Sequence, residues 1–114
     1  MGRRTATELG KLTERWRGDA RWYILSEPIS YTKRDAWGDE AHHTTSYVIV
    51  SALATSEGGQ TYIFPADDSG EELDMKELPG SYVGGLDHRR ALWNAGFVLV
   101  GGSKKPFKRK NENR

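Results

Sequence analysis

The stretch Thr-Thr-Ser-Tyr-Val-Ile-Val-Ser-Ala-Leu-Ala, residues 44–54, decides the fold that we expect for this chain. Successive side chains of a β-strand point to opposite faces of the sheet, and here both sets are apolar. Tyr47 and Ile49 fall on one face, and Val48 and Val50 fall on the other. A strand that is apolar on both faces is typical of a sheet centre covered on both sides.

Strands are also expected on either side of this central strand. Residues 56–59 form a glycine-rich turn and residues 60–64 return as a short strand, which together predict a hairpin. Residues 21–31 have an extended pattern. Pro28 cannot donate to a ladder, so we expect this strand to bend, bulge or lie at an edge there. Residues 32–43 are interpreted as a polar connection.

The N-terminal region has the signals of a helix. Thr5 and Glu8 have the spacing of a capping box. Leu9, Leu12 and Trp16 then recur at three and four residues, which places them on one helical face. We therefore predict a first helix over about residues 6–17.

A second helix is expected near the C-terminus. Asp87 is a good N-cap, residues 88–95 follow as the helix, and Gly96 suits the left-handed position that ends it. Phe97 can then contact Leu92, as in a Schellman ending. Residues 97–100 have the pattern of a fourth strand.

The expected fold class is α+β, with the element order αβββαβ. It is an antiparallel sheet of three to four strands packed against one or two helices. Residues 1–101 would form this single domain, and residues 102–114 a basic, disordered tail. A chain of 114 residues is of ordinary single-domain size.

Composition excludes several classes of protein. The chain has no cysteine, so disulfide scaffolds, thiol nucleophiles and thiolate metal sites are ruled out. The longest apolar run, residues 47–50, is far shorter than the ~20 residues that span a bilayer. The N-terminus lacks the apolar segment of a secretory signal. We expect a cytoplasmic protein that makes no membrane contact.

Charge is strongly segregated along the sequence. Residues 1–34 hold eight Lys or Arg against four Asp or Glu, residues 35–88 one against eleven, and residues 89–114 eight against one. Two readings stay open: the basic ends fold back onto the acidic middle, or they attract an anionic partner.

No group of residues marks a catalytic centre. The adjacent histidines His42 and His43 would point to opposite faces of a strand, so a single metal ion cannot easily take both. We expect no metal site and no cofactor. His88 is the weak catalytic candidate, because it begins a helix beside a glycine-bearing loop that could face a cleft.

Two surfaces are candidates for binding a partner protein. Trp37 lies in a polar segment and is the aromatic residue least needed by a core, and exposed tryptophans are common anchors. The acidic residues Asp67, Asp68, Glu71 and Glu72 do not have the spacing of a calcium loop, but they can contact a basic partner. The alternative for Trp37 is that it covers one face of the sheet.

The basic tail is a candidate for binding nucleic acid. Its cations can contact phosphates and its one aromatic ring can stack on a base. The residues are Lys104, Lys105, Phe107, Lys108, Arg109 and Lys110. The alternative is that the tail only keeps the chain in solution.

Several short stretches resemble small uncharacterised proteins encoded by actinobacterial phages. They are Thr-Tyr-Ile-Phe-Pro-Ala-Asp at 61–67, Leu-Pro-Gly-Ser-Tyr at 78–82, Gly-Gly-Leu-Asp-His at 84–88 and Ala-Gly-Phe at 95–97, and the resemblance covers about residues 44–100. The family has no assigned activity. The resemblance implies a phage accessory role inside a bacterial host, and it carries over no site residues.

These observations lead to one hypothesis and two alternatives. The hypothesis is a non-enzymatic binding protein, a phage accessory factor that acts on a host or phage protein. The first alternative is a nucleic-acid-binding protein that uses the basic termini. The second is a small hydrolase or nuclease that uses His88.

Overall fold

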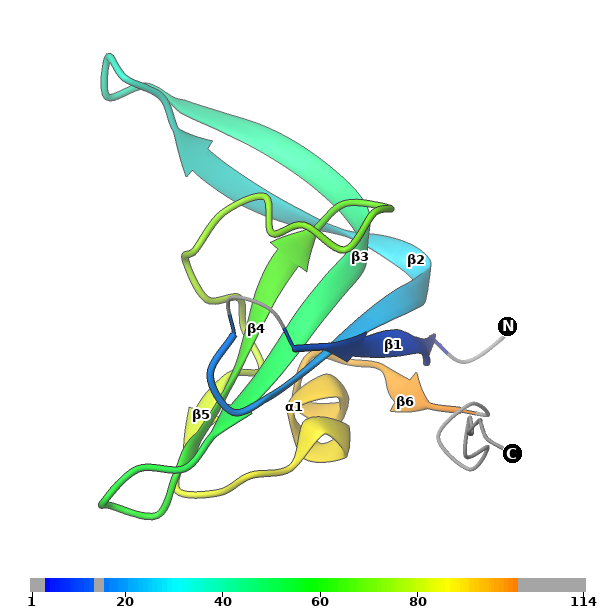
Figure 1. The fold of residues 1–114 in the computed structure, drawn as a ribbon. Helices are drawn as coiled ribbons and strands as arrows, with labels where there is room; N and C mark the ends of the chain where they lie inside the picture. Colours follow the sequence, from blue (N-terminus) through cyan, green and yellow to red (C-terminus); the bar gives the residue numbers. More distant parts are fainter. Residues whose placement is uncertain (1–3, 14–15, 101–114) are drawn as a thin grey trace.

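The computed structural model describes residues 4–13 and 16–100, and these form one curled sheet with one helix (Figure 1). The elements are β1 (Thr5–Leu12), β2 (Asp19–Arg34), β3 (Glu40–Leu53), β4 (Gln60–Ala66), β5 (Tyr82–Val83), α1 (His88–Asn94) and β6 (Val98–Leu99). The strand order across the sheet is β5-β4-β3-β2-β1-β6. Neighbouring strands are antiparallel except β1 and β6, which are parallel.

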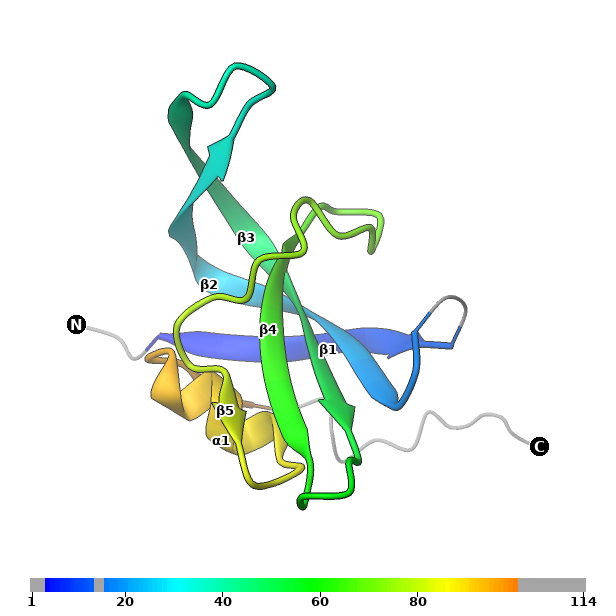
Figure 2. The same cartoon turned by 90° about the vertical axis from the view of Figure 1, so that its left-hand side faces the viewer.

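The predicted α+β fold with the order αβββαβ is wrong. The described part of the chain is mostly β, and its six strands curl into a half-barrel with one short helix on the inner side (Figures 1 and 2). The prediction that residues 44–54 form a strand inside the sheet is confirmed for residues 44–53, which belong to β3. β3 pairs with β2 on one side and β4 on the other, and both of its faces are covered.

The predicted first helix over residues 6–17 is strand β1 instead. Glu8 pairs with Tyr23 and Gly10 with Trp22, so Leu9 is an extra residue in a β-bulge. The extra residue in the bulge interrupts the alternation of faces along the strand. Leu9 and Leu12 can therefore lie on one side of the strand although they have the three-residue spacing that is typical of a helix face. Pairing with β2 overrides the local capping signal.

Residues 32–43, interpreted as a polar connection, mostly extend β2 and β3 into a hairpin that projects from the sheet. We call residues 29–45 the arm (Figures 1 and 2). Its pairs run from Ile29 opposite Thr45 to Arg34 opposite Glu40. At its base, residues 25–28 of β2 lie opposite one residue of β3, so the irregularity expected at Pro28 is confirmed as a bulge.

The core lies on both faces of the sheet. On the inner face, Tyr23, Val50 and Ile63 pack with Leu92 of α1 and with Phe97. The opposite face carries a smaller cluster, whose buried members are Ala20, Ile49 and Ala66. Trp16, Trp22 and Tyr47 pack against this second cluster and are partly buried.

Helix α1 forms as its sequence signals predicted. The side chain of Asp87 accepts a hydrogen bond from the backbone amide of Arg90. Gly96 has a φ of 99°, and the amide of Phe97 donates to the carbonyl of Leu92 at 2.9 Å. The N-cap and the Schellman ending are therefore both confirmed. Within the described residues, no helix is long and apolar enough to cross a membrane.

Candidate functional site

Trp37 lies in the turn at the tip of the arm and is 87% exposed. The turn that carries it is closed by hydrogen bonds. One carboxylate oxygen of Asp35 accepts from the amides of Trp37 and Asp39, at 2.8 and 3.0 Å. Gly38, at a φ of 87°, completes the reversal and donates its amide to the carbonyl of Asp35 at 3.1 Å. The alternative in which Trp37 covers the sheet is wrong.

The stem of the arm is held by its own side chains. Tyr31 and His43 stack across the two strands with ring centroids 5.4 Å apart. Arg34 donates to the Gly38 carbonyl at 2.9 Å and pairs with Glu40 at 3.1 Å. A two-stranded hairpin is only marginally stable alone, so these contacts stabilise the paired stem that carries the tip.

The acidic residues 67–72 form a closed turn beside the base of the arm, not at its tip (Figures 1 and 2). The carboxylate of Asp67 accepts hydrogen bonds from the amide of Glu71 at 3.0 Å and from the hydroxyl of Ser69 at 2.7 Å. These bonds, with that from the Ser69 amide, lower the pKa of Asp67. The indole of Trp22 donates to the Asp67 carbonyl at 3.2 Å, which ties the turn to the sheet.

The proposed docking residues are therefore separated. The turn that carries Trp37 lies at the far end of the arm, whereas the segment 67–72, which holds Asp67, Asp68, Glu71 and Glu72, lies by its base (Figures 1 and 2). The amine of Lys33, on the arm, donates to the carbonyl of Leu73, just after the acidic turn, at 3.0 Å.

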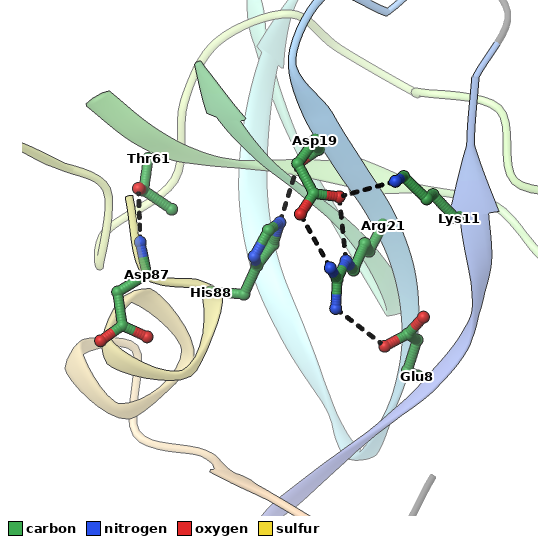
Figure 3. Close-up of polar contacts among 7 residues, drawn as sticks. All are labelled: Glu8, Lys11, Asp19, Arg21, Thr61, Asp87 and His88. Atoms are coloured by element: carbon green, nitrogen blue, oxygen red, sulfur yellow. Dashed lines mark hydrogen bonds and ion pairs between the residues drawn. The ribbon is translucent and has the colours of Figure 1, made fainter. Parts of the chain in front are cut away.

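His88 contacts the inner face of the sheet (Figure 3). Its Nε2 lies 2.8 Å from the main-chain carbonyl oxygen of Asp19. A carbonyl can only accept, so Nε2 carries the proton. The neighbouring Asp87 amide donates to the hydroxyl of buried Thr61 at 3.2 Å. Both contacts attach the start of α1 to the sheet. The contact that His88 makes is therefore a structural one, although this residue was the weak catalytic candidate.

Sequence reasoning missed a polar cluster around this histidine. We call Glu8, Lys11, Asp19, Arg21 and His88 the interior polar cluster (Figure 3). Arg21 binds the Asp19 carboxylate through two nitrogens, at 2.9 and 2.8 Å, and lies 3.5 Å from Glu8. Lys11 lies 4.0 Å from Asp19. The sequence contains no motif for this cluster, because strand pairing brings its members together.

The two carboxylates of the cluster are both matched by cations. Only 8% of the Glu8 side chain is exposed, and Arg21 supplies its opposite charge. Partial burial would raise the pKa of Asp19, but the hydrogen bond from Arg21 and the surrounding positive charges hold that pKa below its usual value. The arrangement is that of a structural ion-pair network joining β1 and β2.

Tyr23 lies against this cluster and is fully buried. Its ring centroid is 6.4 Å from that of His88. Among the described residues, its hydroxyl has no hydrogen-bond partner. Burial raises the pKa of Tyr23, and the negative charge of Glu8 adds to the effect.

The outer side of α1 is a second exposed surface. Trp93 is 66% exposed and stands four residues after Arg89, so the two share a helical face. Together with Arg90 they border a groove of about 640 Å³ that reaches Val98 and Leu99 of β6. The predicted nucleic-acid residues of the tail, Lys104 to Lys110, lie outside the described residues.

In the described ranges no three His, Asp or Glu side chains lie close enough together to hold a metal ion. His42 pairs with Thr32 and His43 with Tyr31 along the arm. Comparison with known proteins adds no candidate function: no family model, curated protein or solved structure matches the chain.

Proposed function

We propose that this chain is a non-enzymatic binding protein that docks on a partner protein through the tip of the arm. The single observation that supports it most is the exposure of Trp37 in a turn that its own hydrogen bonds hold in place. In line with the resemblance to actinobacterial phage proteins, the role is that of a phage accessory protein, and the partner is a host or phage protein.

A pre-ordered tryptophan is well suited to anchor an interface. Truncation of such a residue commonly costs at least ~2 kcal/mol of binding energy, because a large ring leaves water for an apolar pocket. The turn around Trp37 is ordered before binding, so less conformational entropy is lost on association. The tip of the arm stands clear of the rest of the sheet (Figure 2), so the exposed ring of Trp37 can enter a concave surface.

The distribution of charge along the chain indicates the character of the partner. The full chain has a formal net charge of +1, but residues 35–88, which include the arm tip, hold eleven Asp or Glu against one Lys. Residues 67–72 contribute Asp67, Asp68, Glu71 and Glu72 to that balance. We therefore propose a partner with an apolar pocket for Trp37 and a basic rim.

Affinity capture from an actinobacterial host lysate tests this proposal. The full chain, Trp37→Ala and the control Trp93→Ala would be used side by side. We expect a specific protein to be retained by the wild type and by Trp93→Ala, and to be lost with Trp37→Ala. Equal retention by all three proteins would contradict the arm as the docking site, and so would the absence of any retained protein.

Tryptophan fluorescence of the free protein gives a second test. The spectrum lost on Trp37→Phe substitution should have the red-shifted, quencher-accessible emission of a solvated indole. A blue-shifted and quencher-protected difference spectrum would show that the free monomer already buries this ring, and the anchor proposal would fail.

Nucleic-acid binding is the second candidate function. The observation in its favour is the groove beside α1, where Arg89, Arg90 and Trp93 can supply cations and a stacking ring close to the end of β6. It predicts oligonucleotide affinity that falls steeply with salt and with deletion of residues 103–114. Salt-insensitive binding, or none to RNA and DNA, would exclude it.

A further inference from the structure

An apolar pocket of about 250 Å³ opens between α1 and the inner face of the sheet. Its walls are buried side chains from both layers: Leu25, Val48 and Ile63 from the strands, with Leu92 and Phe97 from the helix and the residues after it. Pro28, in the bulge of β2, and Ile29 and Ser30, at the base of the arm, line its more exposed side together with Arg4. The pocket is thus built into the body of the protein, away from the tip of the arm.

Arg4 is the one charged residue among those that line the pocket. Its guanidinium carbon lies 5.1 Å from the centroid of the Phe97 ring, which forms part of the apolar wall. Its Nε donates to Glu27 at 3.1 Å, and the two side chains of that ion pair are 48% and 55% exposed. An ion pair as exposed as this one contributes little, so Arg4 can exchange Glu27 for another carboxylate at small cost.

We propose that this pocket binds a small monocarboxylate with an apolar tail. The tail lies against Leu25, Ile63 and Leu92, and the carboxylate meets the guanidinium of Arg4 at the rim. The guanidinium fork matches the two oxygens of a carboxylate, whereas an alcohol offers one oxygen and an amine carries the wrong charge. The apolar walls supply affinity for the tail, and Arg4 supplies the preference for the head group.

The volume limits the length of the tail. A water-sized group occupies about 30 Å³, so about 250 Å³ accommodates roughly eight such groups. The pocket is smaller than the ~300–1,000 Å³ typical of sites for larger ligands. Straight-chain acids of about six to eight carbons therefore match the space best.

Titration of the full-length protein with butyrate, hexanoate and octanoate, followed by calorimetry and by amide NMR shifts, tests the proposal. Hexanol and hexylamine serve as head-group controls. We expect affinity to rise from butyrate to octanoate, with shifts concentrated at Leu25, Val48 and Leu92. Hexanol should bind about tenfold more weakly than hexanoate or worse, since it lacks the charge-assisted bond to Arg4.

Three variants separately test the contact of Arg4 with the carboxylate, the opening of the pocket and the independence of the pocket from the arm. Arg4→Gln should bring hexanoate down to the affinity of hexanol and leave hexanol unchanged. Ile29→Trp, which places a large ring at the rim, should abolish binding of both while circular dichroism shows the native fold. Trp37→Ala should bind hexanoate as the wild type does, which separates this site from the docking site of the arm.

Several outcomes would overturn the proposal. One is the absence of any shift at the pocket residues with octanoate at millimolar concentration. Equal affinities for hexanoate and hexanol, or an Arg4→Gln variant that keeps the preference for the acid, would remove the carboxylate site. Shifts confined to other surfaces would place the binding elsewhere.

Discussion

Replacing Tyr23 with phenylalanine should stabilise the protein. Tyr23 is 0% exposed, and among the described residues its hydroxyl has no hydrogen-bond partner. Burying such a group without a partner costs roughly 1–3 kcal/mol. Removing one oxygen leaves a void of about 15 Å³, whose cost at ~24 cal/mol per Å³ is only about 0.4 kcal/mol. The cost of the unpartnered hydroxyl is larger than the cost of the void. We therefore expect Tyr23→Phe to raise the free energy of unfolding by about 1–2 kcal/mol at neutral pH.

The stability of Tyr23→Phe relative to the wild type should increase further above pH 10. An unfolded tyrosine ionises near pH 10, whereas burial and the charge of Glu8 raise the pKa of Tyr23 in the folded protein. Below pH 10 the residue is neutral in both states and its titration has no effect. Above pH 10 the unfolded state releases its proton first, so wild-type stability falls by up to about 1.4 kcal/mol per pH unit. Tyr23→Phe lacks this loss.

Urea denaturation at pH 7 and pH 11, with Tyr62→Phe as the control, measures both effects. Tyr62 lies on the opposite face of the sheet and is partly exposed, so its substitution should change stability by less than about 0.5 kcal/mol. A Tyr23→Phe protein that is less stable than the wild type at pH 7 would refute the reasoning. If the difference in free energy of unfolding between Tyr23→Phe and the wild type is the same at pH 7 and pH 11, the argument from the raised pKa of Tyr23 is refuted.

Three further substitutions test other parts of the structure. Gly80→Ala should destabilise the fold by more than about 2 kcal/mol in chemical denaturation, because Gly80 has a φ of 110° and an added Cβ would lie 2.7 Å from the Ala91 carbonyl oxygen. The control Gly38→Ala, at a φ of 87° in open space, should cost only about 1 kcal/mol. His88→Ala should cost about 1 kcal/mol by loss of its hydrogen bond to the sheet, and an unchanged melting temperature would argue against that role. Asp67→Ala should speed amide exchange at Ser69 and Glu71, whose amides donate to its carboxylate, and unchanged exchange would contradict this account of the turn.

Local signals in the sequence predicted the elements whose stability depends on nearby residues. Helix α1 follows its predicted cap, Asp87, and stops just before Gly96, because the cap and the stop signal each act within one turn of chain. The hairpin of β3 and β4 follows for the same reason, since a glycine-rich turn joins two apolar strands. The bulge at Pro28 is likewise a local consequence of a residue that cannot donate.

Elements that depend on distant partners were mispredicted. Thr5 and Glu8 have the spacing of a helix cap, yet pairing with β2 and β6 stabilises β1 more than an isolated helix of about twelve residues would be stabilised. The bulge at Leu9 conceals the period of two that would have indicated a strand. Residues 32–43 of the arm were missed because most of them are polar on both faces, so hydrophobic alternation gives no signal there.

The same distinction explains which site residues the sequence could indicate. Trp37 was a candidate because a large aromatic ring in a polar segment stands out in any local window. The pocket behind Arg4 has no such signature: its walls come from residues 25–97, and each is an ordinary core residue when taken alone. Parallel pairing of β6 with the start of β1 brings Arg4 over Phe97 and so places a cation at an apolar opening. A site of this kind follows from the topology of the sheet, and the topology is the part of the fold that pattern and propensity specify least.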